Sequence, residues 1–164
     1  MILPQAVSRP IKFMPLPLLQ QATRLVFNQM LRQHPNLFDR LGSHASKSFR
    51  FTPTDLDLSF LVMPAKRTIT VSRKSADMAA DASAGGPLLT LLALLEGQID
   101  GDAMFFGRSL SIAGDMEAML ALRNALDDSG FDLPRDLGQA AGPFAPLATR
   151  FAEAVRRRAL VGLV

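Results

Sequence analysis

Apolar side chains in residues 16–34 recur every three or four positions, and Pro35 ends the run. The stripe that they form consists of Leu18, Ala22, Leu25, Val26 and Met30. Phe27 and Leu31 lie off this stripe, so a helix here carries apolar side chains on more than one face. We therefore predict a helix whose second face is covered by the following segment NLFDRLG, by a ligand or by a partner.

In residues 47–83 the hydrophobic period changes from helical spacing to strict alternation, which is typical of strands with one covered face. Three strands are predicted from the apolar positions Phe49 and Phe51, then Leu56, Leu58, Phe60 and Val62, then Ile69 and Val71. A fourth strand is predicted from Met78, Ala80 and Ala82. A fifth is predicted from Met104, Phe106, Leu110 and Ile112, with Arg108 on the same face.

Two more helices are predicted on either side of the fifth strand. In the run LLTLLALLEG, Pro87 suits the first turn and Gly97 suits the C-cap. This helix is apolar nearly all round, so protein or a bound apolar molecule must cover every side. Asp115 suits the N-cap of a helix that continues to about Asp127, and Arg123 projects into its apolar side. That apolar side consists of Met116, Met119, Leu120, Leu122 and Leu126.

The C-terminal part is predicted to be a Gly/Pro-containing connector followed by a basic amphipathic helix that begins at Pro143. Its apolar stripe comprises Phe144, Leu147, Ala148, Phe151 and Val155, and its opposite face carries Arg150, Glu153, Arg156 and Arg157. A membrane, a partner or the protein's own core would each suit such a helix. We thus divide the chain into an N-terminal helical extension (1–37), a central α+β domain (38–130), and the connector with the C-terminal helix (131–164).

Composition narrows the classes of protein. The 164 residues suffice for one domain, and 48% hydrophobic with 20% charged residues exclude a disordered chain. Eleven Phe and eight Met, without Trp or Tyr, either fill an ordinary core or repack around an apolar ligand. Because cysteine is absent, disulfides, thiolate nucleophiles and Cys-ligated metals are excluded. Prolines interrupt the N-terminal apolar residues and no run of about 20 apolar residues follows, so we expect a cytoplasmic protein.

The net charge of +3 conceals an uneven distribution along the chain. Residues 1–50 carry a net charge of +6, residues 51–142 carry −6, and residues 143–164 carry +3. Basic ends favour an anionic surface, either phospholipid or nucleic acid, although basic termini are often only solvated. Because no aromatic residues are interleaved with a basic stripe, we expect no nucleic-acid partner.

No pattern in the sequence predicts catalysis, a metal or a cofactor. His34 and His44 have no acidic residue at a metal-ligand spacing, and Ser43 beside His44 lacks a GxSxG motif. Arg108 and Arg123 are permanent cations in otherwise apolar patterns. They either snorkel to an edge or bind a phosphate or carboxylate headgroup.

The string GRSLSIAGD, residues 107–115, resembles the signature of the sterol carrier protein 2 family. With the two preceding residues, the string also matches the motif FFxRxLxIxGD of one bacterial group in that family, at Phe105, Phe106, Arg108, Leu110, Ile112, Gly114 and Asp115. The similarity covers roughly residues 38–130, and within the family it is greatest to the bacterial UbiT-type accessory factors. The resemblance implies a five-stranded sheet with helices that enclose an apolar tunnel. It also implies binding of a lipid or isoprenoid-quinone intermediate in support of ubiquinone biosynthesis, particularly the oxygen-independent route, with hydroxylase subunits as partners.

We therefore expect a non-catalytic lipid carrier, with its cavity between the sheet and the helices that begin near residues 87 and 115. The residues expected to contact the lipid are Phe60, Val62, Leu88, Leu91, Leu92, Leu95, Met104, Phe106, Leu110, Met119 and Leu122. Those expected to contact a headgroup or the surface of an anionic inner membrane are Arg108, Arg123, Phe144, Phe151, Arg156 and Arg157. The alternative is a scaffold subunit of a protein complex with no ligand of its own.

Overall fold

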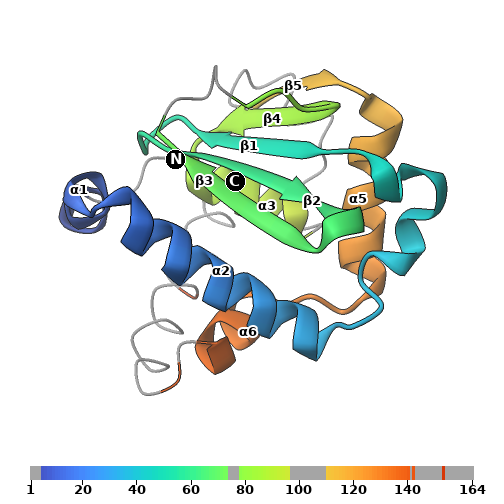
Figure 1. Ribbon diagram of the computed structural model, residues 1–164, viewed down its shortest axis with the longest axis horizontal. Helices are drawn as coiled ribbons and strands as arrows, with labels where there is room; N and C mark the ends of the chain where they lie inside the picture. Colours follow the sequence, from blue (N-terminus) through green and yellow to red (C-terminus); the bar gives the residue numbers. More distant parts are fainter. Residues whose placement is uncertain (1–4, 74–77, 97–109, 141, 143–152, 154–164) are drawn as a thin grey trace, which may run out of the picture.

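The computed structural model describes residues 5–73, 78–96, 110–140, 142 and 153, and these form a mixed α+β fold built on one five-stranded sheet (Figure 1). The strands are β1 (Phe49–Pro53), β2 (Ser59–Met63), β3 (Thr68–Ser72), β4 (Ala82–Gly86) and β5 (Ser111–Gly114). Their spatial order is β3-β2-β1-β4-β5. The central pair β1 and β4 is parallel, and the other pairs are antiparallel. The predicted fold class is therefore confirmed.

The helices lie along the edge, the end and one face of this sheet (Figure 1). They are α1 (Gln5–Phe13), α2 (Leu16–Gln33), α3 (Leu88–Leu95), α5 (Met116–Asp128) and α6 (Leu133–Ala140), with 3-10 turns η1 (Asp39–Ser46) and η2 (Pro64–Lys66). Helix α2 packs along β3, and α3 packs against β1, β4 and α5. Among the helices that the structure describes, none has the length and apolar character needed to cross a bilayer.

The predicted strands are present, with shifts at their ends. Leu56 and Leu58 are buried but precede β2, which begins at Ser59. Met78 and Ala80 likewise precede β4, which begins at Ala82. Leu110 precedes the short strand β5. Met104, Phe106 and Arg108 of the predicted fifth strand lie outside the described residues.

The two apolar faces of α2 have different environments. Phe27 and Leu31 are buried, and the Phe27 ring lies 6.1 Å from the ring of Phe38. The segment that follows the helix therefore packs against this second face, which was the first of the three predicted alternatives. The predicted stripe is more exposed: Leu18 is 54% and Leu25 is 64% accessible to solvent.

A polar contact between α2 and the edge of the sheet explains why the Phe27 face of the helix turns inward and the Leu25 face outward. The Gln20 amide donates to the Ile69 carbonyl at 2.9 Å and accepts from the Val71 N–H at 2.7 Å. Strand β3 is at the edge of the sheet, so its outer backbone groups need partners. Gln20 supplies both partners and thereby fixes which face of the helix turns inward.

Residues 129–142, predicted to be a connector, contain the helix α6. The Asp132 side chain accepts a hydrogen bond from the Arg135 N–H at 2.9 Å and so caps the first turn. Pro134 is the second residue of the helix, where the missing N–H of proline has no intrahelical partner to lose. Proline in this segment therefore begins a helix and does not interrupt one. The predicted helix after Pro143 lies outside the described residues, apart from Glu153.

The junction between β5 and α5 explains the Gly-Asp pair of the string GRSLSIAGD. Gly114 has φ +83° and lies against β4, and the next N–H, from Asp115, donates to the Asp81 carbonyl at 2.8 Å. The Asp115 side chain accepts from the Ala118 N–H at 2.9 Å, which confirms the predicted N-cap. That hydrogen bond lowers the pKa of the Asp115 carboxyl below its usual value, because the Ala118 N–H stabilises the ionised carboxylate.

Candidate functional site

A cavity of about 430 Å³ lies between the sheet and the helices α2, α3 and α5. This volume is within the range of pockets that hold small ligands. Apart from Thr23, the described residues that line it are apolar. They are Ala22, Thr23, Val26, Phe27, Met30, Leu37, Phe38, Phe51, Pro53, Phe60, Val62, Ile69, Leu88, Leu91, Leu92, Leu95, Leu122, Leu126 and Phe131. Such a lining suits an apolar molecule and offers almost nothing to a polar one.

The sheet contributes side chains from three adjacent strands. Phe51 of β1 is paired with Phe60 of β2, and Val62 of β2 is paired with Ile69 of β3. Residues paired across neighbouring strands point to the same face, and alternate residues along a strand share it. The period-two pattern therefore places these four side chains together on the cavity face.

Helix α3 uses its all-round apolar surface in two ways. Leu88, Leu91, Leu92 and Leu95 follow the spacing of one helical face, and this face lines the cavity. The remaining apolar side chains, such as Leu89 and Leu94, are buried in the protein core. Protein and the cavity together surround this helix, as its sequence required.

Helix α2 forms the rim of the cavity. Ala22, Val26 and Met30 are four residues apart, and all three line the space. Val26 is 36% exposed while it lines the cavity, so the cavity opens to solvent beside α2. These residues were absent from the predicted contact set, although the stripe in residues 16–34 was the signal that could have identified them.

The predicted lipid contacts fall into three groups. Those that line the cavity are Phe60, Val62, Leu88, Leu91, Leu92, Leu95 and Leu122. Leu110 and Met119 are buried in the packed core and are not part of the described lining. Met119 lies three residues before Leu122 on α5, nearer the start of the helix. Met104 and Phe106 lie outside the described residues.

The predicted headgroup and membrane contacts are mostly outside the described residues. This applies to Arg108, Phe144, Phe151, Arg156 and Arg157. Arg123 is half-buried on α5 and does not line the cavity.

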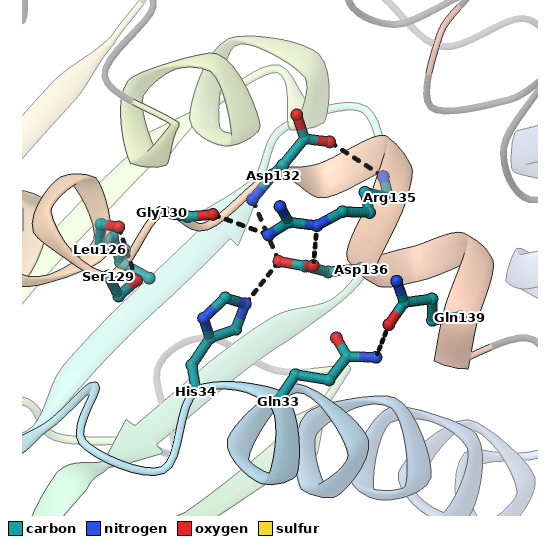
Figure 2. Close-up of polar contacts among 9 residues, drawn as sticks. All are labelled: Gln33, His34, Leu126, Ser129, Gly130, Asp132, Arg135, Asp136 and Gln139. Atoms are coloured by element: carbon teal, nitrogen blue, oxygen red, sulfur yellow. Dashed lines mark hydrogen bonds and ion pairs between the residues drawn. The ribbon is translucent and has the colours of Figure 1, made fainter.

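A buried polar cluster joins α2 to α6 beside the cavity (Figure 2). His34 Nε2 is hydrogen-bonded to Asp136 Oδ2 at 2.8 Å, and the Asp136 side chain also accepts from the Asp132 N–H at 3.0 Å and from Arg135 Nε at 3.0 Å. The His34 ring meets the edge of Phe131, a residue of the cavity lining, with 6.4 Å between the ring centroids. His34 therefore has a structural role, because its hydrogen bond to Asp136 links the end of α2 to α6. Among the described residues, no group of three side chains is arranged to hold a metal ion.

Removing the Asp136 carboxylate should weaken this link between α2 and α6. We expect Asp136→Ala to lower the free energy of unfolding by about 2 kcal/mol, because the His34 ring, the Asp132 N–H and the Arg135 guanidinium each lose a hydrogen bond to a buried carboxylate. Denaturant unfolding of the full chain measures the effect. Asp128→Ala is the matched control, because the Arg40–Asp128 pair is also 2.8 Å long but both side chains are more than half exposed. It should cost less than about 0.5 kcal/mol, and an equal loss in both variants would contradict the assignment.

A family model and several solved structures are similar to this chain. The model of the SCP-2 sterol transfer family matches residues 27–127, which is more than half of the chain. A solved structure named UbiJ-SCP2 Ubiquinone synthesis protein is similar, with 22% identity and a TM-score of 0.57; the match covers 73% of this chain and 98% of that one. At this identity the similarity supports the fold alone.

Two weaker matches are sterol carrier proteins from other organisms. The apo form of Sterol Carrier Protein 2 from Yarrowia lipolytica has 14% identity and a TM-score of 0.49, with 65% of this chain and 91% of that one covered. The Aedes aegypti protein in complex with palmitate has 12% identity and a TM-score of 0.43, with 57% and 94% covered. A sequence comparison with curated proteins found no significant match.

Proposed function

Since the chain belongs to the SCP-2 sterol transfer family, we propose that it is a lipid carrier that holds an apolar molecule in the cavity between α2, α3 and the sheet. The observation that carries this proposal is the lining, in which Thr23 is the one polar residue among those described. The residues proposed to contact the lipid are those of the described lining, together with Met104 and Phe106 of the family-like strand.

The energetics of transfer suit a carrier. A tail of about 15 methylenes gains roughly 12 kcal/mol on leaving water, at about 0.8 kcal/mol for each group. A bilayer offers nearly the same gain, so exchange between bilayer and cavity is close to isoenergetic. The protein then keeps the apolar molecule away from water while a partner acts on it, and no side chain of the carrier needs to react with it.

A narrower proposal concerns the ligand and the pathway. We propose that the ligand is an isoprenoid-quinone intermediate or a phospholipid, and that the protein supports oxygen-independent ubiquinone biosynthesis beside hydroxylase subunits, as a UbiT-type accessory factor. Two observations support this: the resemblance of GRSLSIAGD to that group, and the name of the ubiquinone synthesis protein that shares the fold. Arg108 and Arg123 are proposed headgroup contacts, and Phe144, Phe151, Arg156 and Arg157 are proposed membrane contacts.

Lipid analysis of the purified protein tests the carrier proposal. Full-length protein isolated from cells that make ubiquinone should release a lipid on solvent extraction, and mass spectrometry should identify its class. A quinone precursor in this extract would support the pathway, whereas phospholipid alone would support only the carrier. Protein that carries no lipid, and binds neither a quinone precursor nor a phospholipid in solution, would contradict the proposal and favour the scaffold alternative.

A further inference from the structure

Thr23 places one hydroxyl group on the wall of an otherwise apolar cavity. Its side chain is half-buried and lines the space from α2, as do Ala22 and Val26 at the rim. A threonine hydroxyl can both donate and accept a hydrogen bond. A ligand that turned only hydrocarbon toward this part of the wall would therefore leave a polar group without a partner, which costs free energy.

The protein groups around Thr23 leave its hydroxyl available. Gln20, three residues earlier on α2, already uses its amide group at the edge of the sheet, where it bonds the Ile69 carbonyl and the Val71 N–H. A threonine in a helix can bond a carbonyl of the preceding turn. The Thr23 hydroxyl nevertheless makes no hydrogen bond to any residue that the structure describes. It can therefore bond a molecule in the cavity without breaking a contact in the protein.

The cavity wall offers no comparable partner to a charged group. Among the described residues of the lining there is no Lys, Arg or His. An ionised carboxylate or phosphate inside the cavity would lose its water without gaining a counter-ion, which is costly. A charged head therefore stays in water at the opening beside α2, where Val26 is 36% exposed. An uncharged head can follow its tail inside.

The position of Thr23 in the chain makes this hydroxyl a feature of this protein in particular. The family model matches residues 27–127, and Thr23 precedes them. The hydroxyl reaches the cavity because α2 packs along β3 at the edge of the sheet (Figure 1). It is therefore contributed by a turn of α2 that lies before the matched residues.

We propose that Thr23 is a specificity-determining residue, whose hydroxyl binds a single uncharged hydrogen-bonding group, such as an alcohol or a phenol, on an otherwise apolar ligand. The polar end of the ligand then lies against α2 near the opening, and its apolar part extends toward α3 and the sheet. This inference rests on the proposed carrier function and narrows its ligand to a molecule with an uncharged head.

Thr23→Val tests the proposed hydrogen bond, because valine has a similar shape and lacks the hydroxyl. The probes are dodecanol, dodecane and dodecanoate, each competed against a fluorescent fatty acid in one detergent solution. The dissociation constant of dodecanol should rise about fivefold in Thr23→Val, which corresponds to the loss of one hydrogen bond. Dodecane has no polar head and dodecanoate keeps its ionised head in water, so their dissociation constants should stay unchanged.

Two further variants are matched controls. Thr23→Ser keeps the hydroxyl and should bind dodecanol within about twofold of the original protein. Thr70→Val makes the same substitution on β3, where Thr70 is exposed and does not line the cavity, so it should change the binding of none of the probes.

The outcomes separate this inference from the carrier function. If Thr23→Val binds dodecanol as tightly as the original protein does, the hydroxyl does not contact the ligand and the inference is wrong, while the carrier function stands. An equal loss of dodecanol and dodecane binding also overturns it, because the substitution then acts on the shape of the cavity. If the original protein binds none of the probes, nor the fluorescent fatty acid, the carrier function itself fails and this inference fails with it.

Discussion

Gly114→Ala should lower the free energy of unfolding by about 3 kcal/mol or more, the largest effect on stability that we expect from adding one methyl group. An alanine Cβ at this position would lie 2.2 Å from the carbonyl oxygen of Asp81. That oxygen is part of the backbone and accepts the Asp115 N–H at 2.8 Å, so it cannot move away without breaking the contact between the start of α5 and β4. Denaturant unfolding of the full chain measures the loss.

Gly130→Ala separates the clash from the cost of the backbone conformation. Gly130 has φ +69°, similar to the +83° of Gly114, but nothing lies within 4 Å of the position of an added Cβ. It should therefore show only the left-handed penalty of about 1 kcal/mol. If both variants lose the same stability, the close approach to Asp81 does not matter and our account of the Gly-Asp junction is wrong.

Val26→Trp should weaken binding of a lipid to the cavity at least about tenfold, which corresponds to about 1.4 kcal/mol. Val26 lines the cavity and is 36% exposed, so an indole can enter the space without disturbing the packed core. A tenfold loss requires only that the indole displace about two methylenes of the ligand, at about 0.8 kcal/mol each. Titration with a fluorescent fatty acid, in solution without vesicles, measures the dissociation constant.

Leu25→Trp is the matched control for this experiment. Leu25 is the preceding residue of α2, is 64% exposed and does not line the cavity. It should bind the fatty acid as the original protein does. Because the chain has no Trp, each introduced indole also reports its own surroundings, and the emission at position 26 should be the more blue-shifted. Equal binding by both variants would mean that the lipid does not occupy this cavity.

Most secondary structure could be predicted because each element has a local cause. Phe49 and Phe51 alternate with polar neighbours and form β1, and Asp115 caps α5 where its position after Gly114 indicated. The segment 129–142 was mispredicted because Pro134 has two opposite meanings: it breaks a helix interior but suits a first turn. Only the Asp132 cap distinguishes them.

The candidate site could be predicted only in part. The apolar surface of α3 required a cover on every side, and in the structure Leu88, Leu91, Leu92 and Leu95 form a face that lines the cavity. The rim residues Ala22 and Val26 were missed, because periodicity shows that α2 has two apolar faces but not which of them turns inward.

By itself, the sequence determined the order and type of most elements, the cap and glycine that join β5 to α5, and the apolar excess of α3. These features depend on neighbours within a few positions along the chain. Only the tertiary structure decided the rotation of α2, where Gln20 binds the edge of β3 and leaves Leu18 and Leu25 exposed. It also decided which buried apolar side chains border the cavity, because Met119 and Leu122 are both in the core on one helix, yet only Leu122 of the two lines the cavity. A cavity is a property of contacts between distant segments, and no local pattern specifies those contacts.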